Sequence, residues 1–159
     1  MDGDDAGDRR DRRGIRQYGI GVVQERVLRF ASSGSRDDPA GPREIINIGS
    51  NFGVVAFRGR SVYAGVKAGV HHLARALSLE WAKHGVTVNV VAPCITETES
   101  RRVILERPGY KEWATTQMLP AGRWNQPEDL VGAVLFLSST MSDMVVGHVL
   151  MVDGGWTIH

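Results

Sequence analysis

Three short apolar runs, separated by longer stretches with helical spacing, constrain the fold more than any other feature of this chain. The runs are EIINIG at Glu44 to Gly49, VTVNVVA at Val86 to Ala92 and VLMV at Val149 to Val152. Runs that are β-branched and apolar at nearly every position are typical of strands buried on both faces. Such strands alternating with helices predict an α/β fold, a doubly wound parallel sheet with helices on both faces.

Helical patterns fill the intervals between these runs. Tyr63 to His84 contains no proline, carries an apolar stripe and is followed by Gly85, which predicts a long helix ended by a glycine C-cap. Pro127 is typical of a first helical turn, so a second helix is expected to begin there. A weaker periodicity predicts a helix within Ile15 to Phe30. The polar, irregular stretch Thr96 to Pro120 is expected to form a flexible lobe with short helices.

Composition and charge indicate a single domain that follows a charged tail. Residues 1–14 mix Asp and Arg without apolar periodicity, which predicts a disordered charged tail before one domain over residues 15–159. A net charge of +1 gives no reason to expect nucleic acid or an anionic membrane as partner, and no run approaches the roughly 20 apolar residues of a spanning helix. The single cysteine, Cys94, fits a reducing cytoplasm.

One pair of residues is suited to proton transfer. Tyr63 and Lys67 are four positions apart on the long predicted helix and therefore share a face. A tyrosine hydroxyl ordinarily keeps its proton up to about pH 10, but a neighbouring ammonium stabilises the phenolate and makes the group a usable general acid and base. Ser50, at a strand end, offers a hydroxyl to a substrate oxygen. The spacing alone is equally compatible with a surface Tyr–Lys pair.

Several motifs that follow one another along the chain favour a catalytic role for Tyr63 and Lys67. The segments IINIGS, YAGVKAGV, VTVNVVAP and the closing VDGG follow one another at regular intervals, and Ser50 precedes Tyr63 by thirteen positions. In this order and spacing the chain resembles the short-chain dehydrogenase/reductase family. The resemblance covers residues 44–159 and, more loosely, residues 15–30.

The resemblance implies a Rossmann-like fold and an oxidoreductase that uses NAD or NADP. Tyr63 would exchange a proton with the substrate oxygen, Lys67 would stabilise the phenolate and hydrogen-bond the nicotinamide ribose, and Ser50 would polarise the carbonyl of an alcohol/ketone substrate. The family pattern Pro-Gly-x-x-x-Thr corresponds to PCITET here. The residues expected to bind the cofactor are Tyr63, Lys67, Pro93, Ile95 and Thr98. Family members commonly form homo-oligomers, and the same is expected here.

The chain departs from the family pattern in its first half. No Thr-Gly-x-x-x-Gly-x-Gly turn, which cradles the cofactor pyrophosphate at a helix N-terminus, precedes Ser50. The N-terminal nucleotide-phosphate half of the fold is therefore expected to be missing, and the catalytic domain is expected to be truncated. Cys94 replaces a family glycine, as either a strained or an ordinary small buried residue. The histidines have no zinc-like spacing, so no metal site is expected.

The C-terminal half indicates a substrate branch. The segments EWAKHGVTVN, PAGRWNQPEDLVG and GHVLMVDGGWTIH most resemble gluconate 5-dehydrogenases and 2-deoxy-gluconate 3-dehydrogenases, which implies a sugar-acid substrate. Asn125 stands where this branch usually has glycine. Arg123 and Trp124 either line the substrate side or pack the lobe against the sheet. Two alternatives remain: a 3-oxoacyl-carrier-protein reductase, or an inactive truncated module that only self-associates.

Overall fold

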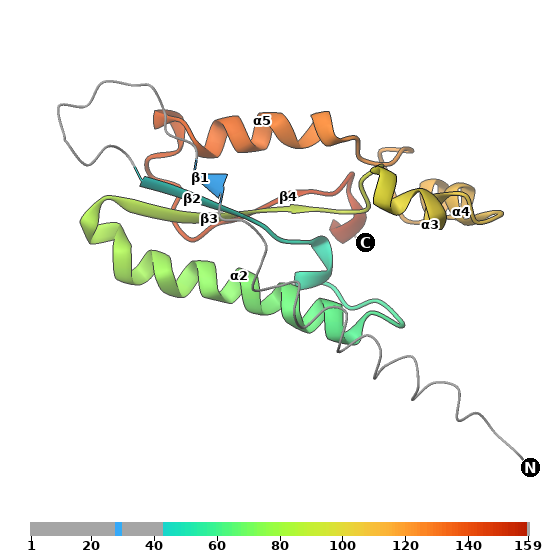
Figure 1. Ribbon diagram of the computed structural model, residues 1–159, viewed down its shortest axis with the longest axis horizontal. Helices are drawn as coiled ribbons and strands as arrows, with labels where there is room; N and C mark the ends of the chain where they lie inside the picture. The colour runs from blue at the N-terminus through green and yellow to red at the C-terminus, as the bar shows by residue number, and fades with distance from the viewer. Residues whose placement is uncertain (1–27, 30–42, 159) are drawn as a thin grey trace, which may run out of the picture.

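The computed structural model describes residues 28–29 and 43–158 (Figure 1). The predicted tail over residues 1–14, most of the helix expected in residues 15–30 and nearly all of the loop before Glu44 lie outside the described residues. The strands are β1 (Leu28–Arg29), β2 (Arg43–Ile48), β3 (Val86–Pro93) and β4 (Val149–Val152). The α-helices are α2 (Ser61–Trp81), α3 (Arg102–Leu105), α4 (Tyr110–Gln117) and α5 (Pro127–Leu137).

The sheet has the order β1-β2-β3-β4, and β2, β3 and β4 run parallel to one another. Helix α2 covers one face of this sheet and α5 covers the other, while α3 and α4 lie beyond the carboxyl ends of the strands (Figure 1). The prediction of an α/β fold with a parallel sheet and helices on both faces is therefore confirmed. Residues that follow β2 and β3 are brought to the same end of the sheet, which positions the site described below.

The N-terminal edge of the sheet corrects one prediction. Leu28 and Arg29 form the short strand β1, antiparallel to β2, with Leu28 opposite Ile46 and Arg29 opposite Ile45. The helix expected over residues 15–30 is therefore wrong at its end. A strand that forms the edge of a sheet carries unpaired N–H and C=O groups along its open side, and pairing with a neighbouring segment satisfies them. The spacing of a few apolar residues could not anticipate this tertiary pairing.

Strand β3 forms the centre of the core because both of its faces are covered. Val88, Val90 and Ala92 pack with Ala74 of α2, whereas the alternate residue Val91 packs with Leu137 of α5. All six of these side chains are fully buried. Side chains alternate between the two faces of a strand, so a central strand covered on both sides must be apolar nearly throughout. This requirement explains the run VTVNVVA.

The long helix carries the residues expected to act on substrate. It begins at Ser61 rather than Tyr63, its regular part ends at Trp81, and a 3-10 turn over Ala82–His84 completes it. Gly85 follows with φ of 72°, a left-handed conformation that glycine adopts without steric cost, so the predicted C-cap is confirmed. The hydroxyl of Ser78 donates to the carbonyl of Val88 at 2.7 Å and thereby fixes the helix against β3.

Helix α5 begins at Pro127, as predicted. The carboxylate of Asp129 accepts a hydrogen bond from the backbone N–H of Gln126 at 2.7 Å, which satisfies a donor at the start of the helix. The stretch from Thr96 to Pro120 contains only short helices, α3 and α4, as expected for the lobe. Residues 96–119 are called the lobe below.

Candidate active site

A cavity of about 250 Å³ lies where β2 and β3 end and the lobe begins. Its lining includes every residue for which a catalytic or cofactor-binding role was predicted from the sequence: Ser50, Tyr63, Lys67, Pro93, Ile95 and Thr98. These residues come from three parts of the chain that are distant in sequence. Folding brings them together because parallel strands deliver their carboxyl ends to one edge of the sheet.

Tyr63 and Lys67 lie one helical turn apart on the inner face of α2. Lys67 is only 3 % exposed, and its Nζ donates to the carbonyl oxygen of Ile48 at 3.1 Å. The same Nζ lies 5.8 Å from the centroid of the Tyr63 ring. A buried ammonium is stable only with partners, and the carbonyl at the end of β2 supplies one of them. The charge is thereby held beside the tyrosine.

Ser50 occupies the turn between β2 and α2. It lies just before the 3-10 turn η1 (Asn51–Gly53), with extended backbone, and its Oγ accepts the N–H of Phe52 at 3.3 Å. The Ser50 hydroxyl also lies 3.3 Å from Oδ1 of Asn51, to which it donates. Nδ2 of Asn51 is buried and has no hydrogen-bond partner among the described residues. Asn51 also lines the cavity, where its Oδ1 holds the Ser50 hydroxyl.

His71 supports Ser50 from the next turn of α2. The backbone N–H of Ser50 points at Nε2 of His71 at 3.4 Å, and the imidazole is 2 % exposed. Burial lowers the pKa of His71, and the positive charges of Arg75 and Lys67 lower it further. The ring is therefore neutral near pH 7 and can accept this hydrogen bond.

Two glycines make room for that imidazole. A Cβ placed on Gly49 would lie 2.3 Å from Nε2 of His71, and a Cβ on Gly53 would lie 2.4 Å from its Cε1. Larger residues at either position would displace the ring. His71 was not predicted as a site residue, although its position four residues after Lys67 places it on the same face of the helix.

Aromatic side chains connect the turn after β2 to the C-terminal segment and the lobe. The rings of Phe52 and Phe57 stack at 5.3 Å between centroids, and both contact Trp156 edge-on, at 5.7 and 5.9 Å. Phe57 also lies 6.2 Å from Trp113 of α4. Phe52, Phe57 and Trp156 of this group line the cavity and give it an apolar border.

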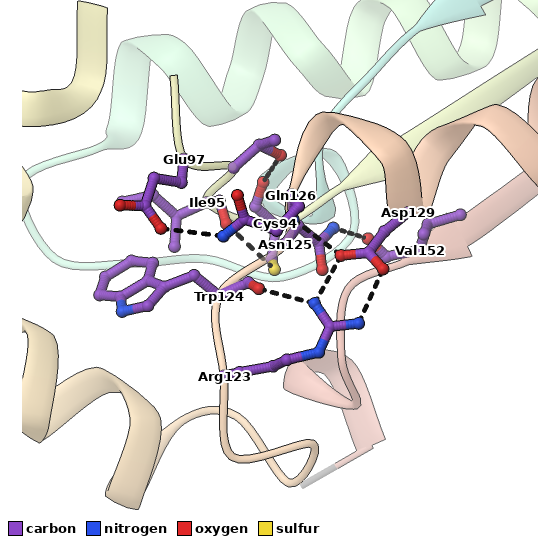
Figure 2. Close-up of polar contacts among 10 residues, drawn as sticks. Cys94, Ile95, Glu97, Arg123, Trp124, Asn125, Gln126, Asp129 and Val152 are labelled. Carbon is purple, nitrogen blue, oxygen red and sulfur yellow. Dashed lines mark hydrogen bonds and ion pairs between the residues drawn. The ribbon is translucent and has the colours of Figure 1, made fainter. Parts of the chain in front are cut away.

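The segment after β3 is fixed by the residues before α5 (Figure 2). Asn125 is buried and donates through Nδ2 to the carbonyl of Val152, while its backbone carbonyl accepts the N–H of Glu97 at 2.8 Å. The Glu97 carboxylate accepts from Nε2 of Gln126 at 2.8 Å. An asparagine in place of the branch's usual glycine therefore ties the end of β4 to the loop after β3.

Arg123 and Trp124 pack the lobe and do not line the cavity. The guanidinium of Arg123 donates two hydrogen bonds to Asp129, at 2.6 and 2.7 Å, and a third to the backbone carbonyl of Trp124 (Figure 2). The hydrogen bonds from Arg123 and from the Gln126 backbone lower the pKa of Asp129 to about 2. The Trp124 ring is buried in the cluster that contains Leu105. Of the two interpretations, packing is the one observed.

Cys94 is a buried packing residue. It belongs to the apolar cluster of the lobe with Leu105, Ala114 and Trp124. Desolvation, together with the negative charge of Asp153, raises the pKa of its thiol to about 12. A thiol that stays protonated at neutral pH is a poor nucleophile, so the cavity gains no reactive cysteine.

Neither a metal cluster nor a membrane span is found in the described part of the chain. Residues 28–29 and 43–158 hold no group of three or more His, Cys, Asp or Glu side chains suited to a metal ion. Their helices are too short or too polar to cross a bilayer.

Comparison with known proteins places this geometry in a family. The model of the family described as "Enoyl-(Acyl carrier protein) reductase" matches residues 29–157. Gluconate 5-dehydrogenase of Gluconobacter oxydans is 39% identical over 120 residues, which cover 76% of this chain and 46% of that protein. Galactitol 2-dehydrogenase of Cereibacter sphaeroides is 40% identical over 121 residues, covering 74% and 47%. The chain thus spans about half the length of the curated relatives it matches.

A solved structure agrees with these sequence matches. Gluconate 5-dehydrogenase from Burkholderia cenocepacia, crystallised with NADP and tartrate, superposes with a TM-score of 0.70 at 38% identity, covering 73% of this chain and 45% of that one. The family match, the identity to these relatives and the shared fold together make the conclusion firm. This chain belongs to the short-chain dehydrogenase/reductase family.

Proposed function

We propose that this chain carries the proton-transfer part of an NAD(P)-dependent oxidoreductase that interconverts a secondary alcohol and a ketone. The observation that carries the proposal is the placement of Ser50, Tyr63 and Lys67 around one cavity, with the Lys67 ammonium held beside the Tyr63 ring. A hydroxyl, a phenol and a buried cation are the groups that alcohol oxidation needs for orientation and proton removal.

Each of the three residues has a distinct role in the proposal. In the oxidation direction the Tyr63 oxygen takes the proton of the substrate hydroxyl, while the carbon that bears this hydroxyl loses a hydride and becomes a carbonyl. Lys67 stabilises the tyrosine as phenolate through its charge. The Ser50 hydroxyl orients the same substrate oxygen. Reduction of the ketone reverses these steps, and Tyr63 then returns the proton.

NAD or NADP would supply the hydride acceptor or donor. Pro93, Ile95 and Thr98 line the cavity from the segment after β3, and we propose that they contact the nicotinamide end of the cofactor. The B. cenocepacia relative was crystallised with NADP, which supports the same class of cofactor here.

The substrate class follows the relatives. Gluconate and 2-dehydro-3-deoxy-gluconate dehydrogenases are 38 to 39% identical to this chain, which supports a sugar acid as substrate. The galactitol enzyme is equally similar, so identity does not separate an acid from a neutral polyol.

We also propose that the protein is a homo-oligomer of the cytoplasm. Large apolar side chains are exposed on the outer sides of both long helices: Leu73 and Leu79 on α2, Val131 and Leu135 on α5. Apolar patches of this kind support self-association, because an assembly removes them from water. The lone buried cysteine is compatible with a reducing compartment.

The test is calorimetric titration of the purified chain with NADPH and NADH, followed by turnover assays with gluconate and the matching keto acid. Saturable binding together with cofactor-dependent oxidation is the expected result. A folded sample, verified by circular dichroism, that binds neither nucleotide would refute activity of this chain and favour the self-associating module.

A further inference from the structure

The charges that line the cavity are all of one sign. Arg60, Lys67 and Arg101 contribute cationic groups, and among the described residues no aspartate or glutamate contributes to the lining. The rest of the lining is neutral and combines apolar and aromatic side chains with uncharged polar residues such as Ser50, Asn51 and Thr98. A cleft with charges of one sign and low-dielectric walls concentrates its field and attracts ligands of the opposite charge. The lining therefore favours an anion.

The two arginines differ from Lys67 in what they contact. Lys67 is committed to the carbonyl of Ile48 and to the Tyr63 ring. Arg60 and Arg101 are half-buried, and neither guanidinium is ion-paired with another described residue. A guanidinium carries five N–H donors in a planar fork that matches a carboxylate, and a half-buried one gains most from such a partner.

The positions of these arginines suit one bound molecule. Arg60 immediately precedes α2 and lies three residues before Tyr63. Arg101 ends the 3-10 turn η3 (Glu99–Arg101) of the lobe, where its backbone N–H donates to the carbonyl of Thr98 at 2.9 Å. Both residues line the cavity that Tyr63 also lines, although they belong to different parts of the fold.

We propose that Arg60 and Arg101 bind the carboxylate of the substrate and so select a hydroxy acid over a neutral polyol. The proposal rests on the proposed function, because it takes the ligand of this cavity to be the substrate whose alcohol carbon lies at Tyr63. It also decides a point that the relatives leave open, since their substrates include gluconate and galactitol. Arg101 would then bring the lobe into contact with the substrate.

The experiment compares two arginine variants with two matched controls. Arg60→Gln and Arg101→Gln remove the charges in the cavity, whereas Arg58→Gln and Arg102→Gln remove exposed charges close by in the sequence that do not line it. Each protein is titrated calorimetrically with gluconate and with sorbitol, which carries a CH₂OH group where gluconate carries the carboxylate. NADPH is titrated in parallel.

The expected result is a selective loss. Each cavity variant should bind gluconate about tenfold more weakly, the loss of roughly one charge-assisted hydrogen bond, with no change for sorbitol or NADPH. The controls should match the unmodified chain. Equal affinity of the unmodified chain for gluconate and sorbitol, no gluconate binding at all, or equal losses in the controls would overturn the proposal.

The NADPH titrations separate this proposal from the proposed function. If the cavity variants lose NADPH affinity as strongly as gluconate affinity, the arginines serve the cofactor phosphates and the carboxylate assignment is wrong. If gluconate selectivity depends on both arginines while no variant and no unmodified sample binds nicotinamide nucleotide, the carboxylate site stands and the oxidoreductase proposal fails.

Discussion

The two walls of the cavity are held in place by different means. The strand–helix wall (Ser50, Asn51, Tyr63 and Lys67) is mostly buried and is fixed by hydrogen bonds to the end of β2 and to α2. The lobe wall (Thr98, Arg101, Ile104 and Tyr110) lies on short turns and helices, and its side chains are half-buried or exposed. Groups that transfer protons must be positioned to within a fraction of an ångström. Groups that select a substrate commonly lie on loops, whose sequence and conformation vary more. The difference assigns chemistry to the first wall, and selection to the second wall together with Arg60 of the loop before α2.

The largest effect should come from removing the Tyr63 hydroxyl. Tyr63→Phe keeps the ring that contacts Phe52 edge-on at 6.3 Å, so the fold should be unchanged. Loss of a general acid and base costs about 10²- to 10⁴-fold in rate, so kcat should fall by that factor with little change in KM. Steady-state kinetics with the best substrate of the titrations would measure it.

Tyr110→Phe is the matched control on the lobe wall. Tyr110 lines the same cavity, but its ring packs against Trp113 and Trp124, whereas that of Tyr63 lies beside the Lys67 ammonium. Its hydroxyl should therefore affect kcat far less than that of Tyr63. Equal losses in kcat for the two variants would contradict the assignment of proton transfer to the strand–helix wall alone.

The second prediction concerns the support of the strand–helix wall. His71→Leu removes the acceptor of the Ser50 N–H, and an unpaired buried donor costs about 1 to 3 kcal/mol of unfolding free energy. The displaced serine should lower kcat by about 10- to 100-fold. His71→Gln offers a new acceptor and should recover part of both losses. Urea unfolding and steady-state kinetics would measure the two effects.

The pH dependence of stability distinguishes a His71 ring that accepts a hydrogen bond from one that only fills space. Burial, Arg75 and Lys67 lower the pKa of His71 in the folded protein, so the neutral acceptor is favoured. Its contribution to stability is fully present above about pH 6.5 and is lost as the pH falls below that value. His71→Gln should weaken this pH dependence, whereas His72→Gln, at the exposed neighbouring position, should preserve it. An unchanged profile in His71→Gln would refute the role of the imidazole.

The two walls also differ in how much of them could be predicted from the sequence. Ser50, Tyr63 and Lys67 follow strand and helix periodicities, which are local and repeat along the chain, so their placement at one strand end could be inferred. Arg60 and Arg101 lie in a loop and a short turn, where no period indicates the direction of a side chain. Their shared cavity depends on how the lobe packs, which only the structure reveals.

Among the strands, too, the features set by local sequence were predicted and those set by tertiary pairing were not. β4 has the predicted bounds, because an apolar run between turn residues limits a buried strand at both ends. β1 was missed because its pairing depends on the open edge of β2, a partner distant in sequence. His71 was also missed: its helical position was predictable, but its hydrogen bond to Ser50 requires the close approach permitted by Gly49 and Gly53.

The smallest predicted effect concerns the ion pair between Arg123, in the loop that follows the lobe, and Asp129 in the first turn of α5. Asp129→Asn removes a carboxylate that accepts two hydrogen bonds from Arg123 and one from the backbone of Gln126. The pair is largely exposed, with 60% of the Arg123 side chain accessible, so Tm should fall only slightly at neutral pH and kcat should change little. Differential scanning calorimetry would measure the shift.

Protonation of the Asp129 carboxylate at low pH should remove the contribution of this ion pair to stability. The hydrogen bonds from Arg123 hold the pKa of Asp129 at about 2 in the folded protein, below its usual value. A lowered carboxyl pKa adds stability that is present above about pH 4 and is lost as the pH falls through about 2. The difference in Tm between the unmodified chain and Asp129→Asn should therefore shrink across that interval. Glu128→Gln, an exposed neighbour without such hydrogen bonds, should show no such convergence. If both variants behave alike, the contribution comes from net charge rather than from the Arg123–Asp129 contact, and the lobe is held mainly by the Asn125 hydrogen bonds.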